Sequence, residues 1–124
     1  MRLLVDTHAA LWLLGEDKRL SPTADQMLTD ASNEVLLSAA VVWEVAIKQS
    51  LGKLDAPDGF AKMLMDGGAM PLSVSIEHAY AVRSLPWHHR DPFDRVLVAQ
   101  AILEDAVIVS SDDRLRAYDV RVAW

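Results

Sequence analysis

The sequence predicts one α/β domain in which a mainly parallel sheet lies between two layers of helices, a three-layer α/β/α arrangement. Three observations lead to this fold class. Short apolar runs alternate with longer helical patterns along the chain, which is typical of βαβ units. Residues 3–5 and 106–109 are continuously apolar, as expected of central strands covered on both faces. Finally, 124 residues is the size of one domain, and no linker, repeat or low-complexity segment divides residues 1–124.

Capping residues and prolines set the expected boundaries of the elements. Ser21 before Pro22 is typical of a helix start, because proline has no N–H to leave unpaired in the first turn. Gly15 and Gly52 follow helical patterns and predict where they end. Pro71 lacks an N–H donor, so its apolar run predicts a short or edge strand. Strands are expected at 2–5, 34–38, 70–74, 106–109 and 120–123, and helices at 8–14, 22–31, 39–51, 60–66, 75–84, 93–104 and 112–118.

Composition and charge exclude several classes of protein. The 12 basic and 18 acidic residues leave a net charge of −6, which argues against binding nucleic acid by bulk charge. The absence of cysteine excludes disulfides, thiol catalysis and thiolate zinc sites. No apolar run approaches the roughly 20 residues that span a bilayer, so no membrane association is predicted. Asp6 interrupts what would be the apolar region of a signal peptide, so the cytoplasm is the expected location.

Two aspartates come after predicted strands, at the sheet edge where parallel α/β folds bind ligands. Asp6 follows the run 2–5 directly, and Asp112 follows the run 106–109 and two serines. Aspartate is a favoured helix N-cap, and it is equally a short, rigid metal ligand. Each residue taken alone leaves both interpretations open.

Three further acids occur within helices or at their starts. Glu44 lies on a largely apolar helix face and needs a partner, which is either Lys48, four residues on, or a metal ion. Asp91 before Pro92 is the natural N-cap of the next helix, and Asp94 falls in its first turn, where the helix dipole favours an acid. A capping role is favoured for Asp91, whereas Asp94 is expected closer to the strand ends.

Considered together, these acids indicate a metal site. A parallel sheet can bring to one edge the elements that carry Asp6, Glu44, Asp94 and Asp112. Four carboxylates in one pocket repel one another unless cations neutralise them. Oxygen ligands suit Mg²⁺ or Mn²⁺, and such an ion activates water and stabilises the leaving oxygen of a phosphodiester. The combination predicts metal-assisted phosphodiester hydrolysis.

Four short segments occur in a specific order along the chain, although each alone is a weak signal. They are VDTHA (5–9), WEVAIK (43–48), LGKL (51–54) and HHRDPFDR (88–95). The segments 99–101, 109–112 and 118–124 fit the same pattern. With this combination the chain resembles the PIN-domain ribonucleases of the VapC toxin type over essentially its whole length.

The resemblance implies a metal-dependent endoribonuclease with a three-layer PIN-like fold, Mg²⁺ or Mn²⁺ as cofactor and RNA as substrate. The acidic quartet of the family falls on Asp6, Glu44, Asp94 and Asp112. Asp6 and Asp94 are expected to hold the main ion. Glu44 is expected to bind it or to position the attacking water, and Asp112 to act as an outer or second-site ligand.

The family also implies supporting residues and partners. Thr7 and Ser110 match the small hydroxyl residues beside the acids, and Asp91 is a further supporting residue. Asp113 departs from the family pattern and leaves open whether Asp112 or Asp113 points inward. The implied partners are a small VapB-like antitoxin, which blocks the site, and a second copy of the chain in a homodimer.

Basic residues near the acids are candidates for contact with RNA phosphates, a solvated surface charge being the ordinary alternative for each. They are Arg90, Arg95 and Lys48, with Lys53, Arg114 and Arg116 beside them. His88 and His89 are adjacent, and no cysteine or third nearby histidine completes a zinc set with them. A role in the loop or in substrate contact is therefore favoured for this pair.

Three other functions have different sequence requirements. A phosphoaspartyl phosphatase needs a second aspartate two residues after Asp6, where this chain has His8. A receiver-like signalling domain needs a lysine at a late strand end, where Ser110 and Ser111 stand. The strongest rival is a catalytically inactive PIN-like module that only binds a partner. The intact set of acids argues against it, and metal-dependent RNA cleavage separates the two.

Overall fold

A single five-stranded sheet forms the centre of the protein in the computed structural model, which describes residues 1–124. The strand order is β3-β2-β1-β4-β5, and all four neighbouring pairs are parallel. This confirms the predicted parallel sheet. The strands are β1 (Arg2–Val5), β2 (Glu34–Ser38), β3 (Met70–Leu72), β4 (Val107–Val109) and β5 (Val122–Ala123).

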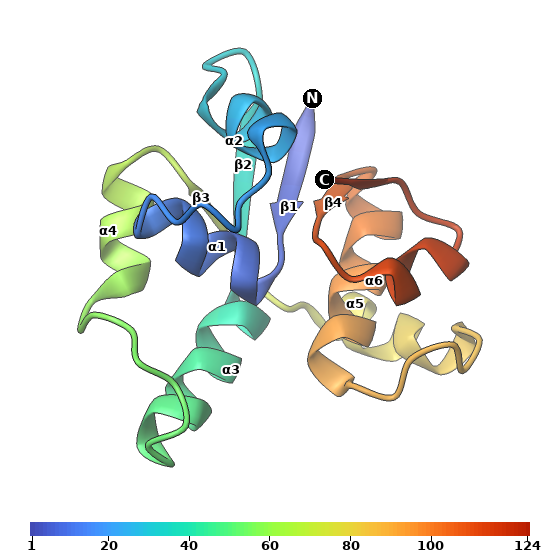
Figure 1. The fold of residues 1–124 in the computed structure, drawn as a ribbon. Coiled ribbons are helices and arrows are strands. Elements are labelled where there is room, and N and C mark those ends of the chain that lie inside the picture. Colours follow the sequence, from blue (N-terminus) through green and yellow to red (C-terminus); the bar gives the residue numbers. More distant parts are fainter.

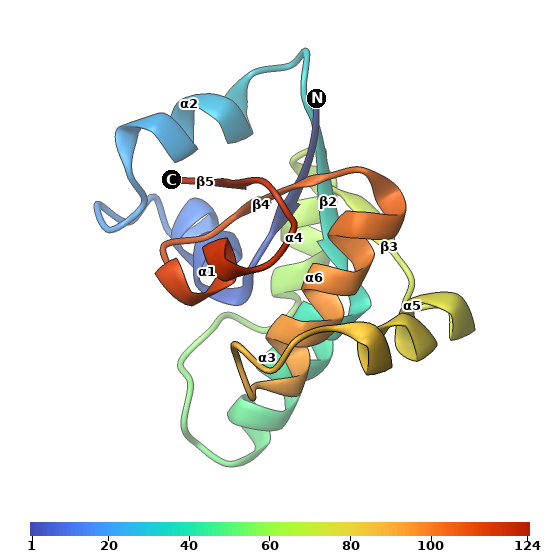
Figure 2. The same cartoon turned by 90° about the vertical axis from the view of Figure 1, so that its right-hand side faces the viewer.

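Helices cover both sides of the sheet, which makes the three predicted layers. In Figure 1, α1 and α4 lie on one side of the strands and α5 and α6 on the other. Figure 2 looks onto the side that carries α5 and α6. The α-helices are α1 (Thr7–Leu14), α2 (Pro22–Thr29), α3 (Ala39–Ser50), α4 (Phe60–Asp66), α5 (Ile76–Ala81) and α6 (Pro92–Glu104), and the 3₁₀ helices are η1 (Val82–Ser84) and η2 (Asp113–Ala117).

The apolar core is centred on β1 and β4. Leu4 pairs with Leu36 of β2 on one side and with Ile108 of β4 on the other, and all three side chains are buried. Burying each such side chain stabilises the fold by about 1.5–3 kcal/mol. The apolar runs of β1 and β4 are therefore explained by their position as central strands with helices on both faces.

Several elements are shorter than predicted, and each difference has a local cause. β3 ends at Leu72 and lies at the sheet edge, as Pro71 indicates. The helix expected over 75–84 becomes α5 and η1. At that junction the Val82 carbonyl accepts both the Leu85 N–H and the Arg95 guanidinium, which tightens the last turn. The expected helix 112–118 is the 3₁₀ helix η2, and β5 is confined to Val122–Ala123.

The carboxyl ends of β1, β2 and β4 meet at one edge of the sheet, because these three neighbouring strands are parallel. At this edge Ser38 ends β2 and caps α3, accepting the Ala40 N–H at 3.0 Å. Its hydroxyl also donates to Gln100 Oε1 of α6 at 2.6 Å. α3 is thus tied to α6 beside the strand ends. Among these helices none combines the length and the hydropathy needed to cross a membrane.

Candidate active site

Four separate elements position the four predicted acids at the carboxyl edge of the sheet. Asp6 directly follows β1 and caps α1, accepting the Ala9 N–H at 2.8 Å. Glu44 projects from α3, Asp94 lies in the first turn of α6, and Asp112 follows β4 and caps η2. Asp6 and Asp112 are thus helix caps, as one interpretation of the sequence predicted. In each residue the capping hydrogen bond involves only the Oδ1 atom of the carboxylate.

The two predicted hydroxyl residues contact the acids directly. Thr7 Oγ1 donates to Glu44 Oε1, which links α1 to α3. Ser110 Oγ donates to Asp6 Oδ2 and accepts the Asp112 N–H at 3.0 Å. Both hydroxyls are buried. Thr7 and Ser110 therefore hold carboxylates that come from elements far apart in the sequence.

His89 is a site residue that the sequence did not reveal. Its Nε2 lies 3.0 Å from Asp94 Oδ2 and 3.2 Å from Asp112 Oδ2, and its side chain is buried. The sequence feature that could have identified His89 is its position two residues before Asp91, the N-cap of α6. There the chain turns back, so that Asp91 N–H donates to His89 Nδ1 at 3.1 Å. Asp91 is itself the predicted cap, accepting the N–H groups of Phe93 and Asp94.

The structure distinguishes the two adjacent aspartates after β4. The Asp112 side chain is 24% exposed and faces His89, whereas the Asp113 side chain is 96% exposed. Arg114 donates hydrogen bonds to the Asp112 carboxylate from two side-chain N–H groups and from its own backbone N–H. These bonds hold the pKa of Asp112 down at about 2. Asp112 is thus the residue that points toward the other acids.

Burial and mutual repulsion oppose ionisation of the other aspartates. Burial raises the pKa of Asp94 to about 7, and the charges of Asp91, Asp6 and Glu44 act in the same direction. Burial also raises the pKa of Asp6, although the Ser110 hydroxyl and the Ala9 N–H act against it. In the protein alone, this edge therefore carries more negative charge than its own side chains can neutralise.

The effect of Ser110 on Asp6 can be tested by removing its hydroxyl. In Ser110→Ala the carboxylate loses a donor that favours its charged form, so the pKa of Asp6 is expected to rise further. An NMR titration of the Asp6 carboxyl carbon in metal-free protein measures this change. Ser111→Ala, at an exposed neighbour, is the matched control. An unchanged or lower Asp6 pKa in Ser110→Ala would contradict the assignment.

Lys48 supplies positive charge within the site. Its Nζ lies 2.6 Å from Glu44 Oε2, and this contact raises the pKa of Lys48. The sequence left open whether Glu44 is partnered by Lys48 or by a metal ion, and the lysine partner is present. Because Glu44 is buried, the pair differs from an exposed helix-surface pair that contributes only a few tenths of a kcal/mol.

The prediction that Arg95 contacts RNA is wrong, and so is its alternative as a solvated surface charge. Arg95 is 3% exposed. Its guanidinium donates to the carbonyls of Val82, Leu85 and Pro86 and to the Tyr118 hydroxyl. Arg95, a residue of α6, therefore holds the loop that precedes this helix by hydrogen bonds. Arg90, by contrast, is exposed, and Lys48 is half-buried against Glu44.

An exposed indole covers the outer face of this buried cation. The Arg95 guanidinium lies 3.8 Å from the ring centre of Trp87, and Trp87 is 76% exposed. A cation–π contact of this kind fixes the ring without burying it. Trp87 therefore stands as an ordered aromatic surface in the loop that carries His89.

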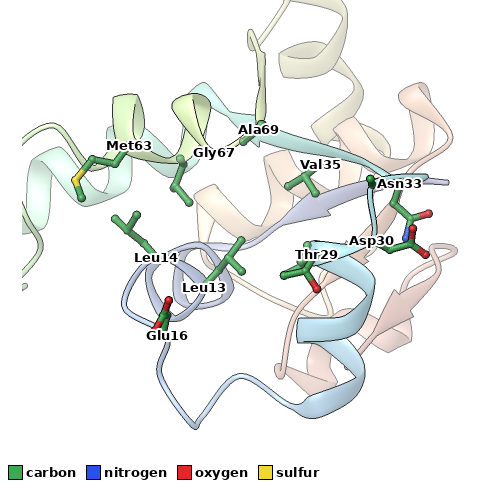
Figure 3. A pocket seen from close by; sticks show the side chains of 14 residues that line it. Leu13, Leu14, Glu16, Thr29, Asp30, Asn33, Val35, Met63, Gly67 and Ala69 are labelled. Atoms are coloured by element: carbon green, nitrogen blue, oxygen red, sulfur yellow. The ribbon is translucent and has the colours of Figure 1, made fainter.

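A broad hollow lies away from the acids. It has a volume of about 560 Å³ and is formed by α1, α2, α4 and β2. Figure 3 shows Leu13, Leu14 and Val35 around it, with Met63 on the facing helix. None of the four acids lines this hollow. The acidic site is instead an open edge of the sheet.

Comparisons with known proteins agree with this arrangement. The family model of the PIN domain matches residues 3–121. Ribonuclease VapC22 of Mycobacterium tuberculosis is 32% identical over 124 residues, which cover 94% of this chain and 91% of that protein. Ribonuclease VapC16 of the same organism is 43% identical over 56 residues, which cover 42% of this chain and 40% of that protein.

Solved structures share the fold at low sequence identity. VapBC2 from Rickettsia felis, bound to a DNA fragment from their promoter, matches with a TM-score of 0.70 and 12% identity, covering 100% of this chain and 99% of that chain. VapBC-1 from nontypeable Haemophilus influenzae matches with a TM-score of 0.67 and 14% identity, covering 99% and 97%. The chain belongs to the PIN domain family, and its similarity to VapC22 places it among the VapC proteins.

Proposed function

We propose that this protein is a metal-dependent endoribonuclease and the toxin of a VapBC-type toxin–antitoxin pair. The observation that carries the proposal is the meeting of four acids from four elements at one sheet edge, with the pKa of Asp94 raised to about 7. A bound cation would relieve the repulsion among these carboxylates. Both curated relatives are named ribonucleases, which supports RNA as the substrate.

The residues present fit a divalent ion with oxygen ligands. The four acids offer carboxylate oxygens, which suit Mg²⁺ or Mn²⁺. Asp6 and Asp94 are the proposed main ligands, since Asp6 is buried, Asp94 is partly buried, and the pKa of each is raised. When bound, the ion would activate a water molecule and stabilise the leaving oxygen of the phosphodiester.

The protein's own side chains would orient this site. Thr7 and Ser110 hold Glu44 and Asp6 by hydrogen bonds, so both carboxylates keep one direction. Lys48 holds the second oxygen of Glu44. We propose Glu44 as a ligand or as the residue that positions water, and Asp112 as an outer ligand. Arg114 is occupied with Asp112, and Arg90 and Lys53 are exposed candidates for contact with an RNA phosphate.

Cleavage of pooled small RNAs by the pure protein tests the proposal. We expect cleavage with Mg²⁺ or Mn²⁺ and none with a chelator. Asp6→Asn should reduce cleavage to the level of the chelator control, whereas Asp113→Asn, at the exposed neighbour of Asp112, should cleave as the unmodified protein does. Cleavage that persists in Asp6→Asn contradicts the site. No cleavage by folded protein favours an inactive partner-binding module.

The proposed partners are an antitoxin and a second copy of this chain. The solved relatives named VapBC support a VapB-like antitoxin. The exposed apolar side chains Trp43, Met63 and Ile76 are consistent with protein contacts. We expect the cognate antitoxin to abolish RNA cleavage, and light scattering of the protein alone to report a homodimer. We also propose the cytoplasm as the location of this activity, since the proposed substrate is RNA.

A further inference from the structure

We infer that His89 is a positioning residue of the metal site, donating its Nε2–H to Asp112 and lying against Asp94, rather than binding the ion itself. The inference rests on the proposed function, because it concerns the same carboxylates. The inference adds His89 to the site as a residue that connects the start of α6 with the segment after β4. The 3.0 and 3.2 Å contacts to the two Oδ2 atoms carry it.

The other ring nitrogen fixes which tautomer is present. Asp91 N–H points at His89 Nδ1 at 3.1 Å, so Nδ1 must accept and cannot carry a proton. The proton of the neutral ring therefore lies on Nε2. The Nε2 atom then has an N–H to donate and no free electron pair for a metal ion.

The ring cannot easily turn away from this arrangement. His89 is 6% exposed, and its backbone N–H donates to the Tyr118 hydroxyl at 2.9 Å. The same hydroxyl accepts from the buried guanidinium of Arg95 at 3.2 Å. The bond from the His89 amide thus fixes the backbone of this residue, and the bond from the Asp91 N–H to Nδ1 fixes the ring.

A direct ligand role is the alternative that the geometry must exclude. His89, Asp94 and Asp112 each offer a ligand atom within 4.8 Å of the others, a spacing that also suits a metal ion. A ligand Nε2 would have to release its proton to Nδ1, and the Asp91 N–H would lose its acceptor. That N–H belongs to Asp91, the N-cap of α6, so the helix start and the ring orientation favour the donor role.

The position of the His89 ring between Asp94 and Asp112 has a consequence for the two carboxylates. Asp94 and Asp112 are like charges on elements with no strand pairing between them. The His89 ring, which donates to Asp112 and contacts Asp94 at 3.0 Å, holds them at a fixed separation before an ion arrives. Outer hydrogen bonds of this kind typically change metal affinity by roughly 10–100-fold when they are removed.

Two substitutions of His89 separate its two nitrogens. His89→Gln places an amide N–H near the position of Nε2, whereas His89→Asn can accept the Asp91 N–H and cannot reach the acids. We expect Mn²⁺ affinity, measured by calorimetry on the full chain, to fall about tenfold or more in His89→Asn and to be largely restored in His89→Gln. His88→Gln, at the exposed neighbour, should keep the affinity of the unmodified protein.

An NMR measurement on the unmodified protein gives a second readout that needs no variant to fold. Nitrogen-15 shifts of the His89 ring should report Nε2–H both without and with saturating Mg²⁺. Loss of that proton on Mg²⁺ binding, or equal affinity in His89→Asn and the unmodified protein, would overturn the inference. Failure of the unmodified protein to bind Mn²⁺ or Mg²⁺ would instead refute the proposed metal site.

Discussion

Asp94→Asn should abolish metal-dependent RNA cleavage and at the same time make the metal-free protein more stable at neutral pH. The loss of cleavage follows because an amide is a poor ligand for a divalent ion compared with a carboxylate. The gain in stability follows because Asp94 ionises in a buried, negatively charged setting, where its pKa is about 7. Few substitutions are expected to raise stability and remove activity together, so the pair of effects identifies a site residue.

The direction of the pH dependence follows from the two pKa values. In the unfolded chain Asp94 loses its proton near its ordinary value of 3.8, and in the folded metal-free protein near 7. Between these values the folded state binds more protons than the unfolded state, so the free energy of unfolding falls as pH rises. Above pH 7 the full penalty is present, and the difference between 3.8 and about 7, at about 1.4 kcal/mol per pKa unit, makes it on the order of 4 kcal/mol.

Urea unfolding at pH 4.5 and pH 8 with a chelator measures this penalty. The unmodified protein should lose more stability than Asp94→Asn on going from the lower to the higher pH. Added Mg²⁺ should restore stability at pH 8 only in the unmodified protein, because it binds the folded state. Asp113→Asn, at the exposed aspartate, should follow the unmodified protein. A pH dependence in Asp94→Asn equal to that of the unmodified protein would show that Asp94 carries no such penalty.

Arg95→Met should lower the free energy of unfolding by roughly 3 kcal/mol, because buried carbonyl groups lose their donors. Three of those carbonyls, on Val82, Leu85 and Pro86, accept from one guanidinium. Methionine fills similar space and offers no N–H group. The same change removes the support beneath Trp87 and loosens the loop that carries His89. Weaker Mn²⁺ binding should therefore accompany the loss of stability.

Chemical unfolding of Arg95→Met beside Arg90→Met measures the effect. Arg90 lies five residues earlier on the exposed surface of the same loop, so its substitution should change stability by less than about 0.5 kcal/mol. If both variants were equally stable, the bonds from Arg95 to the loop carbonyls would contribute nothing to the fold.

The sequence alone determined the layers of this fold and the four acids. Continuous apolar runs at β1 and β4 required burial on both faces, which follows from the hydrophobic effect and needs no tertiary information. The capping role of Asp91 before Pro92 was equally local. Parallel strands then placed the acids at one edge by topology. The sequence also predicted the edge position of β3 through Pro71.

Only the tertiary structure decided which charged and polar groups serve the site and which serve the fold. Arg95 stands in the same segment as Asp94, yet its side chain turns into the carbonyls of the preceding loop. His89 contacts Asp112, 23 residues further along the chain. Asp112 and Asp113 are chemically identical neighbours, and only the turn after β4 directs the first inward. The direction of a side chain depends on partners that are distant in sequence, because an unpaired polar group cannot be buried without cost; local patterns contain no record of those partners.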